Sequence, residues 1–174
     1  MRLAPGSHAL GPDAGTVVVK TYREGVAAKA GHDLVIEVTR WEATVEATAI
    51  ELRVDARSLE VREGLGGVKP LTDRDRGEIR ENIDTKLLGG QPITFRSSAV
   101  RPSDDGVAVD GELTIRGTAR PLTARLRVDD AGRASGTIRI AQSAWGIKPY
   151  RGFMGALKVR DEVDVVIDVQ LPAA

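Results

Sequence analysis

The sequence contains no cysteine among its 174 residues, and this absence removes several kinds of chemistry at once. Without a thiol the chain forms no disulfide, uses no thiolate nucleophile and builds no zinc ribbon or iron–sulfur cluster. Only His8 and His32 offer an imidazole, whereas a catalytic zinc site typically takes three His or carboxylate ligands. We therefore expect no metal site and no metal cofactor, and we expect His32 to form hydrogen bonds in a turn where a strand begins.

The sequence also lacks an excess of charge and a long apolar run. It holds 25 Lys and Arg against 25 Asp and Glu, which gives no long-range attraction to nucleic acid. No apolar run is longer than three residues, so we expect no integral membrane segment. The start of the chain lacks the apolar stretch of about 7–15 residues that a secretory signal needs. These absences predict a cytoplasmic protein with no nucleic-acid partner.

What the sequence does contain is alternation of apolar and polar residues, which is typical of half-buried strands. Residues 1–15 are rich in Gly, Pro and Ala without such alternation, and we interpret them as a flexible tail before a domain over 16–174. Turn residues separate the alternating runs, so the pattern predicts an antiparallel sheet. The runs are residues 17–20, 34–39, 43–49, 50–55, 93–98, 107–116, 122–128, 138–140 and 163–171.

One segment departs from this pattern, because its apolar residues recur at helical spacing. Ile79, Ile83, Leu87 and Leu88 form a single stripe within 73–88, and this predicts one helix. Thr72, Asp73 or Asp75 is a suitable cap, and Gly89-Gly90 ends the helix. The glycine-rich stretch 61–70 before it is interpreted as a long flexible loop.

About eight antiparallel strands must hide their edges, and a closed barrel or a sandwich does so. The polar faces carry charged residues throughout, which suits an outer surface in water. The inward faces combine Val, Leu and Ile with small residues such as Ala43, Gly111 and Ala124. Small lining residues would leave room for a ligand, but a flattened barrel would close the same space. A hollow interior and a packed one both remain open.

Signatures of catalysis are weak. No serine lies in a G-x-S-x-G elbow, and Gly64-Leu65-Gly66-Gly67 lacks the rest of a phosphate-binding loop. The charged run 72–76 is best interpreted as a capped helix start with solvated ion pairs. We therefore expect no catalytic residues and no enzymatic activity.

The stretch 145–155 is the most unusual part of the chain. It gathers Trp145, Tyr150, Phe153 and Met154 between glycines and a proline, a pattern of neither helix nor strand. Such a loop suits the mouth of a cavity that grips an apolar ligand. It equally suits a plug that closes one end of the barrel.

Several short segments, taken in order, resemble the landmarks of YceI-like proteins. They are Lys29 to Leu34, Ser58 to Val61, Ile93 to Ser97, Gly111 to Gly117 with Pro121, Trp145 to Ile147, and Asp161 to Val163. The resemblance runs from about residue 17 to 171. It implies an eight-stranded, antiparallel, up-and-down β-barrel similar to lipocalins, with one helix inserted after about the fourth strand. It also implies a lumen that binds polyisoprenoid or other amphiphilic lipids. The chain differs from many YceI-like proteins in lacking an export signal and in the high charge of its helix.

These observations predict a non-catalytic protein that binds or carries an extended apolar or amphiphilic molecule, such as an isoprenoid or a fatty acid. The alternative is a stress-related scaffold or interaction module with a filled barrel and no small ligand. Whether the chain acts as a monomer or a homodimer is left open. The candidate ligand-binding residues are Leu34, Ile36, Val45, Phe95, Leu113, Trp145, Tyr150, Phe153, Met154 and Ile167.

Overall fold

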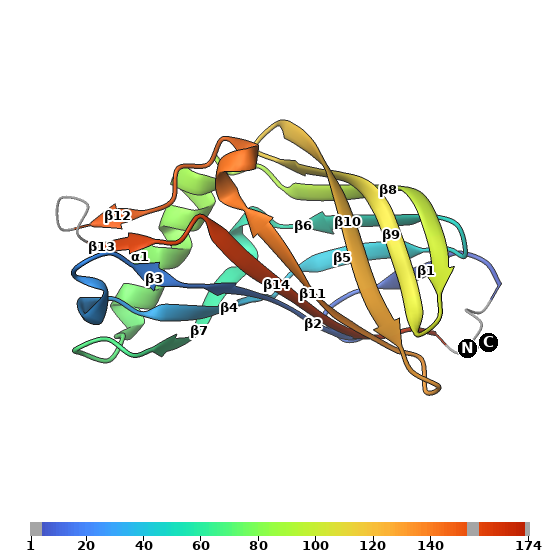
Figure 1. Ribbon diagram of the computed structural model, residues 1–174, viewed down its shortest axis with the longest axis horizontal. Coiled ribbons are helices and arrows are strands. Elements are labelled where there is room, and N and C mark those ends of the chain that lie inside the picture. The colour runs from blue at the N-terminus through green and yellow to red at the C-terminus, as the bar shows by residue number, and fades with distance from the viewer. Residues whose placement is uncertain (1–4, 153–156, 173–174) are drawn as a thin grey trace.

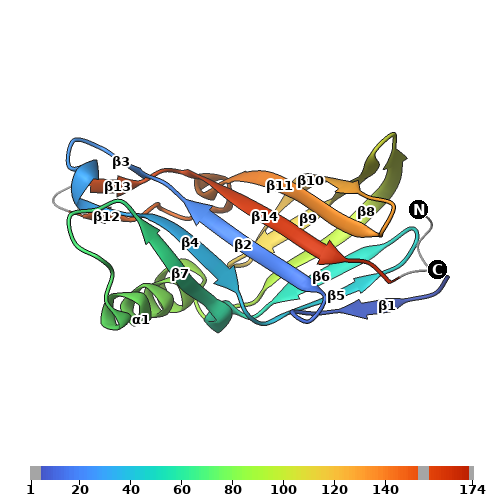
Figure 2. The ribbon, with the colours of Figure 1, turned by 90° about the horizontal axis from the view of Figure 1, so that it is seen from below.

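The computed structural model describes residues 5–152 and 157–172 (Figures 1 and 2). The segments in which apolar and polar residues alternate form antiparallel strands. One α-helix accompanies them, so the predicted all-β class with a single helix is confirmed. The strands are β1 (His8–Leu10), β2 (Gly15–Thr21), β3 (Arg23–Glu24), β4 (Asp33–Val38), β5 (Trp41–Val45), β6 (Ile50–Val54), β7 (Leu59–Leu65), β8 (Ile93–Ser103), β9 (Gly106–Ile115), β10 (Thr118–Val128), β11 (Arg133–Ala141), β12 (Arg151–Gly152), β13 (Leu157–Val159) and β14 (Glu162–Gln170).

Eleven of these strands form one large curled antiparallel sheet, in the order β1-β5-β6-β8-β9-β10-β11-β14-β2-β4-β7. The expected count of eight strands is therefore not what the structure shows. Part of the difference comes from a bend that divides two long segments. β4 continues into β5, and β6 continues into β7, with β4 paired to β7 and β5 paired to β6.

Hydrogen bonds hold the bend together. The amide of Thr39 donates to the Ser58 carbonyl at 2.8 Å, and the amide of Asp55 donates to the Arg40 carbonyl at 3.1 Å. The hydroxyl of Ser58, a fully buried residue, donates to the Arg40 carbonyl at 3.0 Å. Backbone groups that leave the ladder at the bend thus regain partners, as buried polar groups must.

The first residues add a strand that the sequence did not reveal. β1 pairs with β5 at one edge of the large sheet, with His8 opposite Val45 and Leu10 opposite Ala43. The interpretation of all of 1–15 as a loose tail is thus wrong for His8–Leu10. A strand of three residues is too short for its alternation to stand out from a Gly- and Pro-rich segment.

The helical segment agrees closely with its prediction. Thr72 is the N-cap of α1 (Asp73–Asn82) and forms a capping box with Asp75. A single π-helical turn follows over Ile83–Leu87. Ile83 and Leu88 are buried, and Ile79 and Leu87 pack against the same core. The loop before the helix is shorter than expected, because β7 continues to Leu65 and includes half of the stretch 61–70.

The molecule has two unlike ends (Figure 1). The loop end comprises residues 22–33, 62–72, 146–152 and 157–161. There β12, β13 and β3 form a small separate sheet, and Arg23 donates to the Leu65 carbonyl at 3.2 Å. The turn end comprises the tight turns 46–49, 103–106 and 129–132. The turn at 46–49 separates the alternating runs 43–49 and 50–55, which belong to the paired strands β5 and β6.

Candidate ligand-binding site

The inward faces of the large sheet bring apolar side chains from distant parts of the chain together. Val19 lies opposite Ile36 on one side and Val165 on the other, and Val165 lies opposite Ile138. Directly opposed residues share a face of the sheet. In the described strands β2, β4, β11 and β14, the inward positions hold no titratable side chain. This part of the interior therefore offers apolar contact and little chemistry.

Burial differs along this face. Ile36 is only 3% exposed, whereas its neighbours Val19 and Val165, both well inside their strands, are half-buried. A side chain on an inner face remains accessible only if there is space beside it. Val17, Val163 and Val169 on the same two strands are buried, so the looser packing is confined to Val19, Val165 and Ile167 in the middle of β2 and β14.

The predicted ligand-binding residues fall into three groups. Ile36, Val45, Phe95, Leu113 and Trp145 are buried, and Leu34 and Ile167 are half-buried against the core. Tyr150 is 57% exposed. Phe153 and Met154 lie outside the described residues. The fold therefore brings seven of the ten candidates to the interior, six from the sheet and Trp145 from the turn that follows β11.

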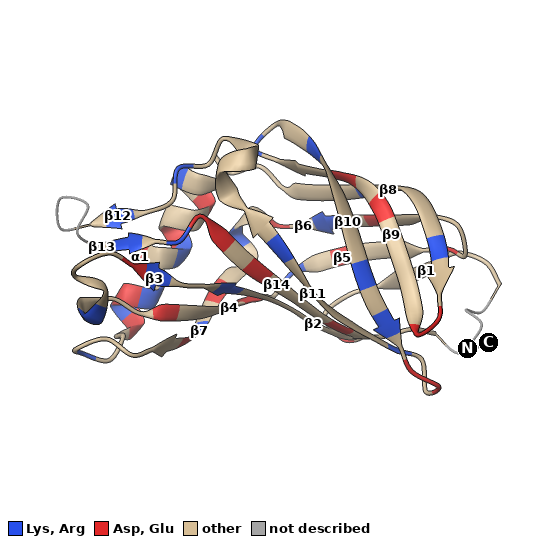
Figure 3. Cartoon of the chain, viewed as in Figure 1, with Lys and Arg blue, Asp and Glu red and all other residues tan. Residues whose placement is uncertain are grey.

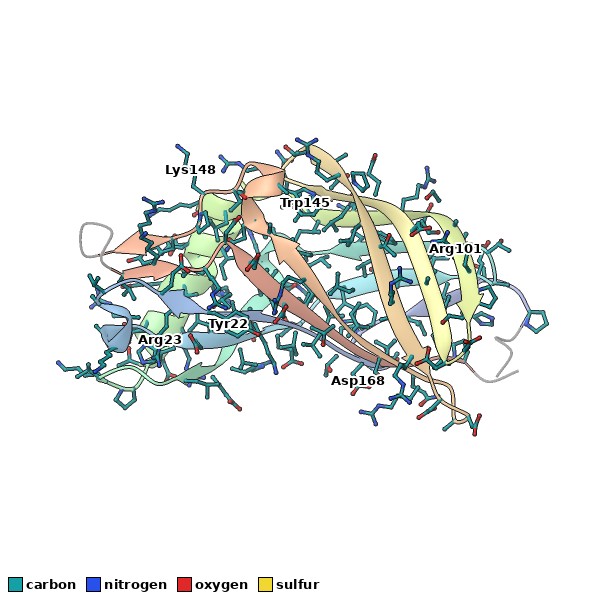
Figure 4. The ribbon with its side chains drawn as sticks, in the orientation of Figure 1. Tyr22, Arg23, Arg101, Trp145, Lys148 and Asp168 are labelled. Carbon is teal, nitrogen blue, oxygen red and sulfur yellow. The ribbon has the colours of Figure 1, made fainter. Side chains whose placement is uncertain are left out.

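The loop that begins at Trp145 divides into a buried part and an exposed part. The Trp145 indole nitrogen donates to the Leu113 carbonyl at 2.8 Å, and Ile147 is also buried (Figure 4). Gly146, at φ 72°, allows the chain to turn between them. Trp145 and Ile147 thus belong to the core, as the plug interpretation predicts, whereas Tyr150 lies at the surface.

Small residues on the inner face do not all leave room. A Cβ atom at Gly111 would lie 2.5 Å from the Phe95 ring, and one at Gly136 would lie 2.8 Å from the side chain of Leu126. Neighbouring side chains thus occupy the space beside these two glycines. Of the two alternatives that the sequence leaves open, these two positions favour a packed interior.

Four buried side-chain polar atoms have no hydrogen-bond partner in the part of the chain that the structure describes: Trp41 Nε1, Thr21 Oγ1, Arg76 Nε and Asp84 Oδ1. The two that belong to uncharged side chains are the indole nitrogen of Trp41 and the hydroxyl of Thr21. Thr21 lies opposite the inward-facing Leu34, and Trp41, 5% exposed, packs in the core at the bend. A buried donor without an acceptor costs folding free energy, so such atoms are unusual. The sequence analysis missed both, because nothing in their local pattern marks them.

Two open hollows accompany the interior. One of about 650 Å³ is bordered by Trp41 with charged neighbours including Arg40 and Asp55, and it faces the bend. The other, of about 570 Å³, lies at the loop end beside Ile147, Lys148 and Arg151. The hollow at the bend has a mixed lining that suits water or a head group, whereas the lining of the loop-end hollow is mostly apolar.

The strongest charged network lies on the outer wall. Tyr22 donates to Asp164 at 2.7 Å, and Arg139 donates to both oxygens of the same carboxylate at 3.0 and 3.2 Å. Arg139, followed by Tyr22, lowers the pKa of Asp164, and the bond to Asp164 raises the pKa of Tyr22. Every partner of this network is satisfied, so it stabilises the wall and offers no free catalytic group.

The other residues considered from sequence have structural roles. The His32 ring nitrogen Nε2 donates to the Lys69 carbonyl at 2.7 Å, just before β4 begins, which confirms the turn interpretation. The cluster 72–76 caps α1, also as predicted. Among the described residues, no three His, Asp or Glu side chains gather as metal ligands would. Nor does any helix within those ranges have the length and apolar character needed to cross a bilayer.

Comparisons with known proteins agree with this architecture. A family model described as the YceI-like domain matches residues 13–171. The crystal structure of BcnA from Burkholderia cenocepacia is similar with a TM-score of 0.60 at 20% identity, over 88% of this chain and 94% of that one. The YCEI protein of Campylobacter jejuni gives a TM-score of 0.44 at 9% identity, over 100% and 90% of the two chains. No curated protein matches the sequence.

Proposed function

The chain belongs to the YceI-like domain family, and we propose from this premise that it binds an extended apolar or amphiphilic molecule inside its curled sheet. The proposal rests on the uneven packing of side chains on the inner face of the sheet, where some are buried and others are half-buried. Val19, Val165, Leu34 and Ile167 are apolar, point inward and are only half-buried. Inward apolar surface that the protein leaves accessible is surface that a ligand can cover.

The proposal includes a closed wall. When the bent segments β4–β5 and β6–β7 each count as one strand, and the short edge strand β1 is set aside, eight strands remain in the large sheet. Their ladders then run from β6 through β8, β9, β10, β11 and β14 to β2, and from β2 through β4 to β7, which continues β6. A ring of eight strands encloses an interior just wide enough for side chains or one small ligand.

The dimensions suit a chain-like ligand. β8 and β10 each have 11 residues, so the wall extends for about 35 Å along a strand. Each methylene transferred from water to such an interior contributes about 0.8 kcal/mol. About ten methylenes therefore offset an association cost near the lower end of about 4–15 kcal/mol.

The unpartnered donors suggest where a polar group of the ligand would lie. A carbonyl, ether or hydroxyl oxygen near Trp41 or Thr21 would accept the hydrogen bond that the protein itself does not supply. The absence of titratable groups on the inward face of β2, β4, β11 and β14 fits a binding role without catalysis. A cytoplasmic location and the choice between monomer and homodimer remain predictions.

The test is to extract natively purified protein with organic solvent and to identify the released molecules by mass spectrometry. We expect one lipid per chain, in near-stoichiometric amount. Repeated extracts without lipid, combined with no binding of a fluorescent fatty acid, would overturn the proposal.

A second function, a scaffold with a filled barrel, is favoured by the packing at Gly111 and Gly136, where Phe95 and Leu126 occupy the inner space. In that case the outer wall would be the working surface. Lipid-free extracts from a stably folded protein would support this function over the first.

A further inference from the structure

The large apolar side chains that the described residues expose are gathered at the loop end. They are Val26 at 96% exposed, Val68 at 76%, Tyr150 at 57% and Leu65 at 52%. They come from three segments distant in sequence. The β12-β13-β3 sheet and the bond from His32 to the Lys69 carbonyl hold these segments side by side. Their gathering at one end of the molecule, instead of a scatter over its whole surface, is the first of two observations that point to contact with a partner there.

The connecting segments at the two ends differ in charge, although the strands and the helix beside them carry both signs (Figure 3). The segments of the loop end carry eight Lys or Arg against four Asp or Glu, whereas the three turns of the turn end carry five acidic residues and no basic one. Among the described residues, Lys29, Lys69, Lys148 and Arg151 have no ion-pair partner. Lys148 projects outward from the loop end (Figure 4). The segments that carry the exposed apolar tips thus also carry cations that are available to a partner.

We propose that the loop end docks on the surface of an anionic lipid bilayer. The apolar tips reach below the head groups, and the surrounding lysines and arginines contact the phosphates. The inference rests on the proposed function, since it places the interior of a lipid carrier next to the source of its ligand. The turn end exposes no large apolar side chain among the described residues, and arginines beside its acidic turns are paired within the protein, as Arg127 is with Asp105, so docking has one orientation.

A bilayer fits this surface better than a protein partner does. The tips are single side chains on separate loops and do not form one continuous apolar face. Five of the surrounding residues are Lys29, Lys69, Lys148, Lys158 and Arg151, and lysine is depleted at protein interfaces. Lysine near an anionic leaflet, by contrast, contributes about a fivefold gain in partitioning per residue. Tyrosine, with an apolar ring and a polar tip, suits the same boundary.

The test is co-sedimentation of the full chain with phosphatidylcholine vesicles that either contain or lack phosphatidylglycerol. We compare the double variant Val26→Ser with Val68→Ser, and the double variant Lys29→Gln with Lys69→Gln. The charge-matched control combines Arg125→Gln with Arg127→Gln on β10, away from the loop end. All six side chains are exposed, so the variants are expected to fold normally.

We expect binding to the anionic vesicles only, weakened about 25-fold by loss of the two lysines and about tenfold by loss of the two valines. The control should bind within about twofold of the unmodified protein. Equal pelleting with and without vesicles would overturn the proposal. So would valine and lysine double variants that bind the vesicles as the unmodified protein does. Self-association that is lost in the valine variant, without vesicle binding, would assign the surface to a second copy of the chain and would also overturn it.

Fluorescent fatty-acid binding in vesicle-free solution separates this inference from the proposed function. If docking is wrong but the carrier function is right, the protein binds the probe and ignores vesicles. If the carrier function is wrong, the probe does not bind, whatever the vesicles show.

Discussion

The two ends of the molecule are built from the same strands but differ in almost every surface property. At the turn end, neighbouring strands are joined by turns of a few residues, and these turns are acidic. At the loop end the connections are long, cationic and tipped with exposed apolar side chains, and they add a second small sheet and the helix. Ile83, Leu88 and Ile147 from these connections complete the core, whereas the exposed tips Val26 and Val68 lie outside it, so the tips serve something other than the fold.

The largest effect should come from the residue that anchors the loop end to the wall. Trp145→Ala removes a buried indole and its bond to the Leu113 carbonyl, and it should lower the free energy of unfolding by about 3–5 kcal/mol. Val45→Ala, buried beside the turn end, removes about two methylene equivalents and should cost about 2 kcal/mol. Urea denaturation measures both values. An equal or smaller loss for Trp145→Ala would show that the loop end is not anchored through this residue.

The second prediction compares Gly111, which neighbouring atoms surround closely, with Gly146, which has open space beside it. At Gly111 a methyl group would collide with the Phe95 ring and the Arg96 carbonyl, so Gly111→Ala should cost about 1–3 kcal/mol. At Gly146 a methyl group would meet no atom within 4 Å, and only the positive φ of 72° opposes it, at a cost of about 1–2 kcal/mol. Thermal unfolding of the two variants distinguishes overpacking from backbone strain. A neutral Gly111→Ala variant would mean that the interior is looser than described.

The sequence predicted the wall better than it predicted the ends. Alternation in 34–39 and 163–171 identifies strands because one face of each is buried, and the helix 73–88 is marked by its cap and apolar stripe. β1 could not be found, because its three residues join the sheet only through pairing with β5. The bend at Ser58 was equally hidden, since its stability comes from backbone partners that are distant in sequence.

The smallest expected changes in the free energy of unfolding come from substitutions of two aspartates on the outer face of β14. Asp164, 8% exposed and bonded to Arg139 and Tyr22, lies nearer the loop end than the more exposed Asp168, which pairs with Arg133. Asp164→Asn should lower the free energy of unfolding by about 1 kcal/mol. Asp168→Asn should cost less than about 0.5 kcal/mol, because solvent screens an exposed pair. The reverse order would contradict the assignment of Asp164 as the central group of the outer network.

The lowered pKa values of both aspartates also predict that the protein loses stability in acid. Their arginine partners lower each pKa below its usual value, so the unfolded chain binds protons first as the pH falls. The contribution is complete above the usual aspartate pKa of about 3.9 and is lost as the pH falls through the lower folded value. Equilibrium unfolding below about pH 4 should therefore show a shallower acid loss in Asp164→Asn than in the unmodified protein.

For the candidate site, the sequence identified the inward residues but not the state of the space between them. Ile36, Phe95 and Leu113 were placed on the inner face by alternation alone. Whether Gly111 opens a space or accommodates Phe95 depends on a neighbour across the ladder, which no local pattern reveals. Trp41 and Thr21 became apparent only when their missing partners could be seen.

The most direct test of the carrier function compares two tryptophan substitutions at neighbouring positions of β14. Ile167 faces the interior, opposite Gly136 and Val17, and Val166 faces outward beside Thr137 and Val18. If the interior is open beside Ile167, Ile167→Trp should change the free energy of unfolding by less than about 1 kcal/mol and abolish lipid binding. Val166→Trp should retain binding. A loss of about 3 kcal/mol or more in Ile167→Trp, with no lipid bound by the unmodified protein, would contradict the account.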